Sequence, residues 1–288
     1  MDKKNLSKKI CWANTSSFDN SDIVIVGIPD ESGSHAYLKG ASKAPDTIRR
    51  VSNERDIYVE GDLKCLALPA QGLPSTRVYD YGNIKKQQIS EVIDKITSSS
   101  KIPVLMGGDH SLTTPIIKAL AKKHQPISLV YFDAHPDFVN HTRNYYGSII
   151  TDSLQYLDVK SSVMVGIRTP EETEIDNIKK HGFRVITPFD VVESGINQIT
   201  KTILNTVKGN VYISLDVDCF DPAYAPGASV PVPLGLASQD VTYLIKKIVQ
   251  RGIVGFDIVE VCPPTDLNDV TSHLASRIIG EVISSCKV

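Results

Sequence analysis

The stretch "ISLVYFDAHPDF", residues 127–138, decides the fold class. Its first half is a run of apolar residues of the kind that forms a strand covered on both faces. Asp133, His135 and Asp137 follow at alternate positions, so they would project to one side if the extended chain continued. The stretch therefore predicts a buried parallel strand with coordinating side chains gathered at its exit.

Similar apolar runs recur along the chain and alternate with helical patterns. The runs cover residues 22–28, 102–108, 127–133, 162–167, 183–187, 210–216 and 253–259. Among the helices, we expect one with Ser238 as its N-cap and one over 171–181 that stops at Gly182. This alternation predicts a single doubly wound α/β domain over residues 1–288, with residues 1–20 as a candidate N-terminal arm.

Composition excludes several classes of protein. The chain carries 31 Lys plus Arg against 33 Asp plus Glu, without a basic block, so nucleic acid is not an expected partner. No apolar stretch reaches the roughly 18 residues of a membrane span, and no apolar segment follows the N-terminal lysines, so we expect a cytoplasmic protein. Its five cysteines are widely spread without a C-x-x-C pair, which argues against a disulfide framework and a zinc-thiolate site.

Three motifs share one predicted location, the carboxyl end of a strand. They are "GGDHS" (107–111), "DAHPD" (133–137) and "SLDVDCFDP" (214–222). Open α/β sheets bind ligands at this edge. We therefore expect His110, from what we take to be the neighbouring strand, to join Asp216, Asp218 and the "DAHPD" side chains.

The charge of this set predicts a metal centre. Four aspartates carry −4, which would raise their pKa values unless cations lay among them, and two divalent ions supply +4. Oxygen and imidazole ligands favour Mn²⁺, Mg²⁺ or a related ion over structural zinc. Two such ions could share a hydroxide, since metal binding lowers the pKa of water. The candidate ligands are His110, Asp133, His135, Asp137, Asp216 and Asp218.

Each part of the pattern also has a simpler interpretation. A single Asp at a strand end commonly caps the next helix, but capping does not require same-face pairs at three strand ends. Near the end of the last strand, Asp257 or Glu260 could be a further ligand, a solvated charge or a clamp for a cationic substrate. We favour the clamp and Glu260, which is closer to the strand exit.

These motifs, in this order, resemble the ureohydrolase family of arginases, agmatinases and relatives, which hydrolyse a guanidino group to urea. The resemblance covers nearly the whole chain. It includes "GIPDESGSHAYLKGASKAPDTIR" (27–49), "DYGNI" (80–84) as a family turn, "GIR" (166–168), "SLDVDCFDPAYAPG" (214–227) and "DIVEVCPPTD" (257–266), the last more similar to agmatinases than to arginases. It implies a three-layer αβα fold with a mainly parallel sheet of about eight strands, two Mn²⁺ per subunit, and assembly as trimers or hexamers.

The resemblance also implies roles for individual residues. His110 and Asp137 would ligate mainly one manganese, His135 and Asp218 the other, while Asp133 and Asp216 would bridge them. A hydroxide held between the ions would attack the guanidinium carbon. Glu260 would help to stabilise the tetrahedral intermediate, and Asp137 would pass a proton to the departing amine.

The chain departs from the family pattern in its loops. The family carries a proton-shuttling histidine where this chain has Tyr146, so either Tyr146 or His141 would have to take over that role. In addition, "APGASVP" (225–231) stands where the family has "APGTGTP", and "YLKGASKAP" (37–45) lacks the family's arginines. We assign substrate binding to Glu260, Asn140, His141 and Tyr146.

Several functions remain open. The first is a Mn²⁺-dependent enzyme of polyamine biosynthesis that cleaves agmatine to putrescine and urea. The second is an arginase or guanidino-acid hydrolase, for which Arg143 or Asn140 could bind a substrate carboxylate. From other classes come a single-zinc amide deacetylase and a homologue that binds metals but has lost efficient catalysis.

Overall fold

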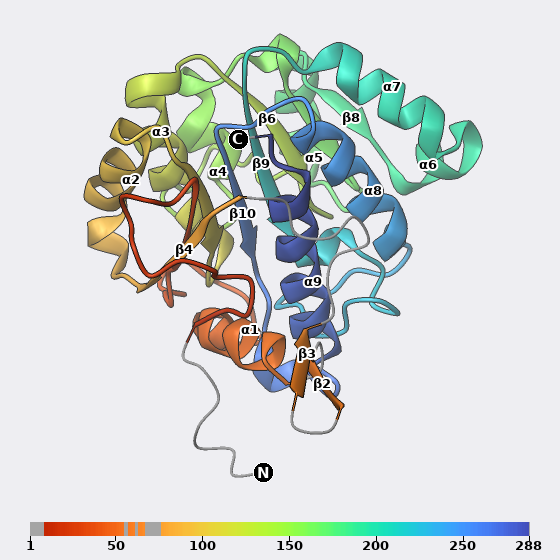
Figure 1. The fold of residues 1–288 in the computed structure, drawn as a ribbon. Helices are drawn as coiled ribbons and strands as arrows, with labels where there is room; N and C mark the ends of the chain where they lie inside the picture. The colour runs from red at the N-terminus through yellow and green to blue at the C-terminus, as the bar shows by residue number, and fades with distance from the viewer. Residues whose placement is uncertain (1–8, 55–56, 61–62, 67–75, 288) are drawn as a thin grey trace.

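An eight-stranded parallel sheet forms the middle layer of the protein (Figure 1). The computed structural model describes residues 9–54, 57–60, 63–66 and 76–287. The strands are β1 Ile23–Gly27, β4 Val78–Asn83, β5 Ile102–Met106, β6 Ile127–Phe132, β7 Val163–Val165, β8 Arg184–Ile186, β9 Asn210–Asp216 and β10 Gly255–Val259. Their order is β4-β1-β5-β10-β9-β6-β7-β8, and every neighbouring pair runs parallel.

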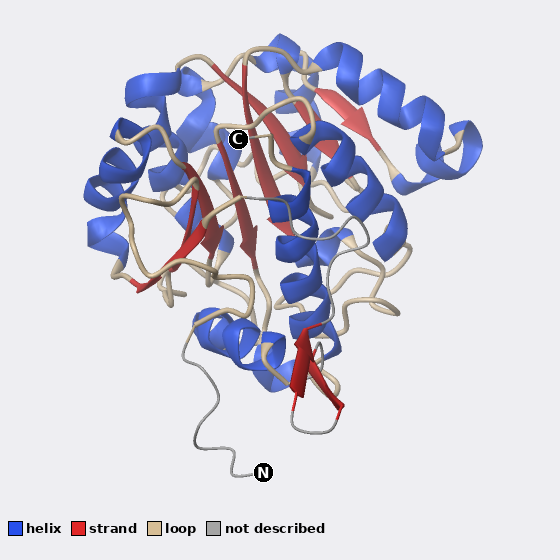
Figure 2. Ribbon diagram, viewed as in Figure 1, coloured by secondary structure: helices blue, strands red, loops and turns tan. Residues whose placement is uncertain are grey.

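Helices cover both faces of this sheet (Figure 2), which confirms the three-layer αβα prediction. One face packs against α1 Ala44–Ser52, α6 Pro188–Ser194, α7 Ile196–Thr206, α8 Ser238–Val249 and α9 Val270–Ser285. The other face packs against α2 Ile89–Ser98, α3 Thr113–His124, α4 Ile149–Ser153 and α5 Glu172–His181. A separate antiparallel hairpin pairs β2 Ile57–Glu60 with β3 Leu63–Leu66.

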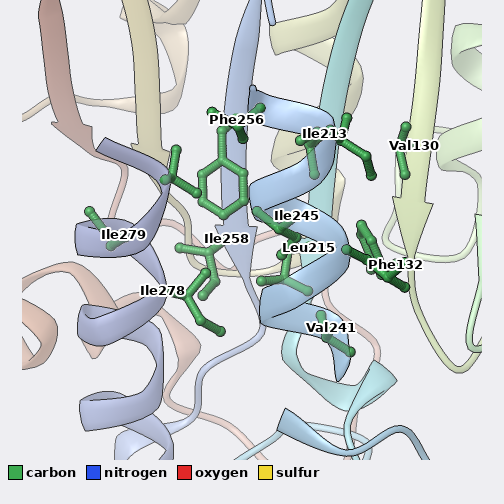
Figure 3. Packing of buried hydrophobic residues seen from close by; sticks show 14 of the residues in the cluster. Val130, Phe132, Ile213, Leu215, Val241, Ile245, Phe256, Ile258, Ile278 and Ile279 are labelled. Carbon is green, nitrogen blue, oxygen red and sulfur yellow. The ribbon is translucent and has the colours of Figure 1, made fainter. Parts of the chain in front are cut away.

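The two-residue repeat of the strands divides the core between the helix layers. Ile213 and Leu215 of β9 lie with Phe256 and Ile258 of β10 in one cluster, and Figure 3 shows these side chains beside α8 and α9. Tyr212, the residue before Ile213, belongs to the cluster on the opposite face. Burial of each large apolar side chain contributes about 1.5–3 kcal/mol, so this sheet is a rigid base for the loops at its edge.

All seven apolar runs contain a strand within the predicted bounds, but β4 was not predicted. The segment "DYGNI", expected to be a turn, lies mostly within this strand. β4 is an edge strand that pairs only with β1, so it needs no continuous apolar run. Its buried Asp80 forms an ion pair with Arg49 of α1 at 2.9 Å, so a charged residue interrupts the apolar pattern of this partly buried strand.

The two helix ends chosen from the sequence differ in outcome. α5 ends at His181, and Gly182 follows in the left-handed conformation with φ 75°, as predicted. α8 begins one residue earlier than expected, because Ala237 is its N-cap and Ser238 is its first helical residue. The described helices include none long and apolar enough to cross a membrane.

The described part of the candidate N-terminal arm packs onto the core. Ile10 and Trp12 are buried, and the Trp12 indole Nε1 donates a hydrogen bond to the Ser276 carbonyl of α9 at 3.1 Å. Gly280 makes room for this ring, since a Cβ there would lie 2.8 Å from it. The prediction of an N-terminal arm over residues 1–20 is therefore wrong from Ile10 onward, and residues 1–8 lie outside the described residues.

We predict that Trp12→Ala lowers the free energy of unfolding by about 3–5 kcal/mol, because it removes a large buried side chain and leaves a cavity against α9. Chemical denaturation monitored by circular dichroism measures the change. Tyr37→Ala is the control, since this aromatic side chain is 98% exposed and its loss should change stability by less than about 0.5 kcal/mol. Equal stability of the two variants would contradict the packing role of Trp12.

Candidate metal centre

The candidate site lies at the carboxyl ends of four adjacent central strands, β5, β10, β9 and β6. His110 follows β5, residues 133–137 follow β6, Asp216 ends β9 and Glu260 follows β10. The expectation that His110 comes from the strand next to β6 is wrong, because β10 and β9 lie between them. The site therefore spans the middle of the sheet, where four strand exits converge.

Turns, rather than an extended chain, bring the coordinating side chains together. β6 ends at Phe132, and Asp137 has a left-handed backbone with φ 47°. Asp218 lies in a short 3₁₀ turn, Val217–Cys219, and its N–H donates to the Asp216 carboxylate at 2.8 Å. The extended chain that we expected over residues 133–137 is therefore not formed. It would spread residues 133 and 137 over about 13 Å, too far for one compact centre.

The first group of candidate ligands surrounds His110. Its Nδ1 lies 3.0 Å from Asp133 Oδ2, 3.2 Å from Asp216 Oδ2 and 3.3 Å from Asp137 Oδ2. One ligand atom each from His110, Asp133 and Asp216 lie within 4.8 Å of one another, close enough to hold one ion. All four side chains are buried.

The second group forms around His135 and shares Asp133 with the first. The His135 Nδ1 lies 2.9 Å from Asp218 Oδ2 and 3.4 Å from Asp133 Oδ1. Asp133, His135 and Asp218 again offer ligand atoms within 4.8 Å of one another. The Asp133 carboxylate thus points one oxygen at each histidine, as a residue that bridges two ions would.

The charge state of the cluster fits divalent cations. Burial, followed by the charges of Asp218 and Asp133, raises the pKa of Asp216 well above its usual range. Burial alone would lower the pKa of His135, but the Asp218 carboxylate raises it to about 12. In addition, the buried Asp133 Oδ2 forms no hydrogen bond within the described part of the chain. Crowded carboxylates that draw protons onto their neighbours, together with this unpaired oxygen, form a donor set suited to metal ions.

A second layer of hydrogen bonds fixes the orientation of His110. The Ser214 hydroxyl donates to Asp257 Oδ1 at 2.7 Å and lies 3.0 Å from His110 Nε2. Because this hydroxyl has a single proton, it accepts the Nε2 proton of His110. The His110 Nδ1 then faces the carboxylates and is the ring nitrogen that could bind a metal ion.

Asp257 anchors this second layer and is not a clamp for substrate. It is fully buried in β10 and also accepts hydrogen bonds from the Thr113 and Tyr212 hydroxyls, at 2.7 and 2.5 Å. Sequence reasoning did not assign Ser214 a role, although its place two residues before Asp216 puts it on the same face of β9. The strand register brings Ser214 opposite Asp257, and that register could not be read from the sequence.

Glu260 has one anchored oxygen and one unpaired oxygen. Its Oε1 accepts a hydrogen bond from the His110 N–H at 2.8 Å, whereas the buried Oε2 has no hydrogen-bond partner among the residues that the structure describes. Burial raises the pKa of this carboxyl to about 8. Its backbone has φ 63°, a strained conformation for a non-glycine residue that is often found at functional sites. The unpaired oxygen beside the cluster is what a clamp for a cation requires.

The loop after "DAHPD" gives different surroundings to its three candidate residues. Asn140 and His141 are exposed, whereas Tyr146 is half-buried and its N–H donates to the Gly33 carbonyl at 3.1 Å. Burial, then the charges of Asp137 and Glu260, raises the pKa of the Tyr146 phenol. Tyr146 is therefore close enough to the cluster to be affected by its charges.

Two further residues were missed by the sequence interpretation. The Tyr131 ring stacks on His110 with centroids 5.0 Å apart, and its hydroxyl donates to Asp137 Oδ2 at 2.5 Å. Arg168, quoted only within "GIR", donates to the Asp218 carbonyl at 2.7 Å and to the Phe220 carbonyl at 3.2 Å. Tyr131 lies two residues before Asp133, the same period-two signal that locates Ser214, whereas no local pattern identifies Arg168 as a brace for the ligand loop.

Comparison with known proteins shows the same architecture and sequence pattern. The Arginase family model matches residues 21–284. The chain belongs to the arginase family. A mitochondrial guanidino acid hydrolase of Homo sapiens is 31% identical over 280 residues, covering 91% of this chain and 77% of its own length. An agmatinase of Bacillus subtilis is 29% identical over 292 residues, covering 96% of each chain.

A solved structure supports the fold independently. The agmatine ureohydrolase of Thermoplasma volcanium is 32% identical, with a TM-score of 0.80 over 97% of this chain and 94% of the other. This similarity confirms the arginase-like α/β fold. The chain is a hydrolase of the arginase family, whose members are metal-dependent and act on guanidino C–N bonds.

We predict that Ser214→Ala weakens metal binding by about tenfold to a hundredfold, because His110 loses the acceptor that fixes its tautomer. Calorimetric titration of metal-free protein with Mn²⁺ measures the effect. Ser162→Ala is the matched control, since Ser162 is equally buried but bonds to Asp158 and Leu129 at the other end of the sheet. Unchanged Mn²⁺ affinity in Ser214→Ala would show that the second layer does not set the tautomer.

Proposed function

We propose that this chain is a binuclear Mn²⁺ amidinohydrolase that cleaves a linear guanidino compound to urea and an amine, with agmatine, which yields putrescine, as substrate. The observation that carries the proposal is the pair of ligand groups sharing Asp133, with the unpaired Oε2 of Glu260 at their side. The two ligand groups are suited to binding a pair of cations, and the unpaired Glu260 oxygen is suited to binding a guanidinium. Membership of the arginase family gives this combination its chemistry.

In the proposed centre, six side chains hold two ions. His110 and Asp137 would serve one ion, His135 and Asp218 the other, and Asp133 and Asp216 both. The distances around His110 and His135 support the two groups and the shared place of Asp133, and the resemblance to the family adds the second contact of Asp216. When bound, the metals would supply Lewis acidity and a water of lowered pKa as the nucleophile.

The protein's own groups would orient the substrate and move the proton. Glu260, fixed through its other oxygen by the His110 N–H, would bind the guanidinium and hold its carbon over the metal cluster. Asp137, held by the Tyr131 hydroxyl, would carry a proton to the departing amine. Tyr146 would line the substrate side of the site and, in preference to the exposed His141, stand in for the histidine of the family pattern.

The surroundings of Arg143 favour agmatine over a guanidino acid. A substrate carboxylate would need a cationic partner, but Arg143 donates to Asp152 at 2.9 Å and to the Thr151 carbonyl at 3.1 Å within its own loop. The second candidate is nevertheless a guanidino-acid hydrolase, favoured by the human relative of that name at 31% identity. Exposed Asn140 would then be the partner of the carboxylate.

The proposal also includes location and assembly. We infer a cytoplasmic enzyme of putrescine formation that assembles as trimers or hexamers. Sedimentation of the purified protein, with the expected mass a multiple of 31.5 kDa, measures the subunit number.

We predict that Asp216→Ala and Glu260→Gln fail in different ways. Asp216→Ala should lose bound metal together with activity, because it removes one of the three candidate ligands around His110. Glu260→Gln should keep its metal and lower kcat/KM by at least about tenfold, because a charge-assisted contact to the guanidinium becomes neutral. Metal analysis and urea assays on the same samples test both variants. If Glu260→Gln emptied a metal site, the proposed division between ligand and clamp would be wrong.

The proposed function is tested by urea release from agmatine, arginine, guanidinobutyrate and guanidinopropionate, with Mn²⁺-loaded protein and metal content measured in parallel. We expect two metals per chain and preferential turnover of agmatine. Preference for guanidinobutyrate would establish the second candidate. One zinc with acetate release from an acetylated amine would instead indicate a deacetylase, and two metals without any product a homologue that has lost catalysis.

A further inference from the structure

Three aromatic side chains from two loops gather beside the candidate site. His35 stacks on Tyr145 with ring centroids 5.0 Å apart and an interplanar angle of 28°. Tyr146 meets His35 edge-on at 6.1 Å and Tyr145 at 5.7 Å. His35 is exposed, whereas the two tyrosines are half-buried. We call His35, Tyr145 and Tyr146 the aromatic rim.

Backbone contacts fix the loop that carries His35 directly over the His110 strand exit. The Gly33 N–H donates to Asp109 Oδ2 at 2.8 Å, and the Gly33 carbonyl accepts the Tyr146 N–H. Gly108 lies so close to this loop that a Cβ there would be 1.9 Å from the Asp30 carbonyl oxygen. The loop containing His35 is therefore bound both to the turn before His110 and to the loop of Tyr146.

Several acidic side chains act on the rim, and two of them, Glu171 and Glu174, lie outside the candidate ligand set and would keep their negative charge uncompensated when metals are bound. Burial, then Asp137, Glu171 and Glu174, raises the pKa of the Tyr145 phenol to about 12. At Tyr146, Asp137 and Glu260 act in the same direction, with His135 as the opposing positive group. Aromatic faces bind cations, and surrounding carboxylates strengthen that preference.

We propose that the aromatic rim binds the cationic far end of the guanidino substrate and that His35 is a specificity-determining residue for it. This inference rests on the proposed function and extends it, since it says which end of the substrate the loop containing His35 binds. The guanidinium reaches Glu260 beside the metal cluster, while the terminal ammonium lies against the rim. A carboxylate tail meets the same acidic surroundings and is disfavoured there.

The test compares agmatine with pentylguanidine, in which a methyl group replaces the ammonium. His35→Ala should lower the kcat/KM ratio of agmatine to pentylguanidine by about threefold to tenfold. His35→Phe keeps an aromatic face and should retain most of the ratio. Tyr37→Ala, two residues away and 98% exposed, is the control and should leave it unchanged.

Calorimetric binding of putrescine to the Mn²⁺-loaded wild type and His35→Ala separates this inference from the proposed function. We expect at least a threefold weaker affinity in His35→Ala, whether or not urea is released. If agmatine is cleaved but neither the substrate ratio nor the putrescine affinity changes in His35→Ala, the rim inference is overturned and the proposed function stands. If no guanidino compound is cleaved, the proposed function fails, and equal putrescine affinity of the two proteins would overturn the rim as well.

Discussion

Buried negative charge is the constraint on which the rest of this structure depends. Four aspartates reach one small region beneath the loops, where burial makes uncompensated carboxylates costly. Two histidines face them directly, and the Ser214–Asp257 layer holds the His110 ring in the orientation that turns its Nδ1 toward the carboxylates. The fold tolerates this arrangement because four central strands end together, and a cation set can replace the protons that the carboxylates otherwise draw onto their neighbours.

Much of the sheet could be predicted because its strands obey a local rule. Seven are continuous apolar runs, as expected for strands covered on both faces, and their helices follow the 3.6-residue period. β4 could not be found this way, because an edge strand stabilised through Asp80 and Arg49 has no such run. The packing of Trp12 could not be predicted for another reason, since its partners Ser276 and Gly280 lie more than 260 residues away in the sequence.

The identity of the candidate ligands could be predicted from the sequence for a chemical reason, whereas their geometry could not. A cluster of Asp and His at three strand exits is difficult to explain without a cation, whichever way the chain turns afterward. How the side chains meet depends on the left-handed backbone of Asp137 and the 3₁₀ turn after Asp216, which no alternation rule contains. The strand order and register that place His110 across the site and Ser214 opposite Asp257 are likewise long-range properties of the sheet.

The division between strand ends and overlying loops explains how the chain can depart from the family pattern in its loops and still keep the candidate metal ligands together. The candidate ligands and their second layer are held by the sheet, whereas Tyr146 and His35 come from loops joined to each other at Gly33. A substitution in either loop changes the surface that meets the far end of a substrate but leaves the Asp257–Ser214–His110 contacts intact. Under the proposed function, the tyrosine at position 146 would change substrate recognition together with His35 and would leave the candidate metal ligands in place.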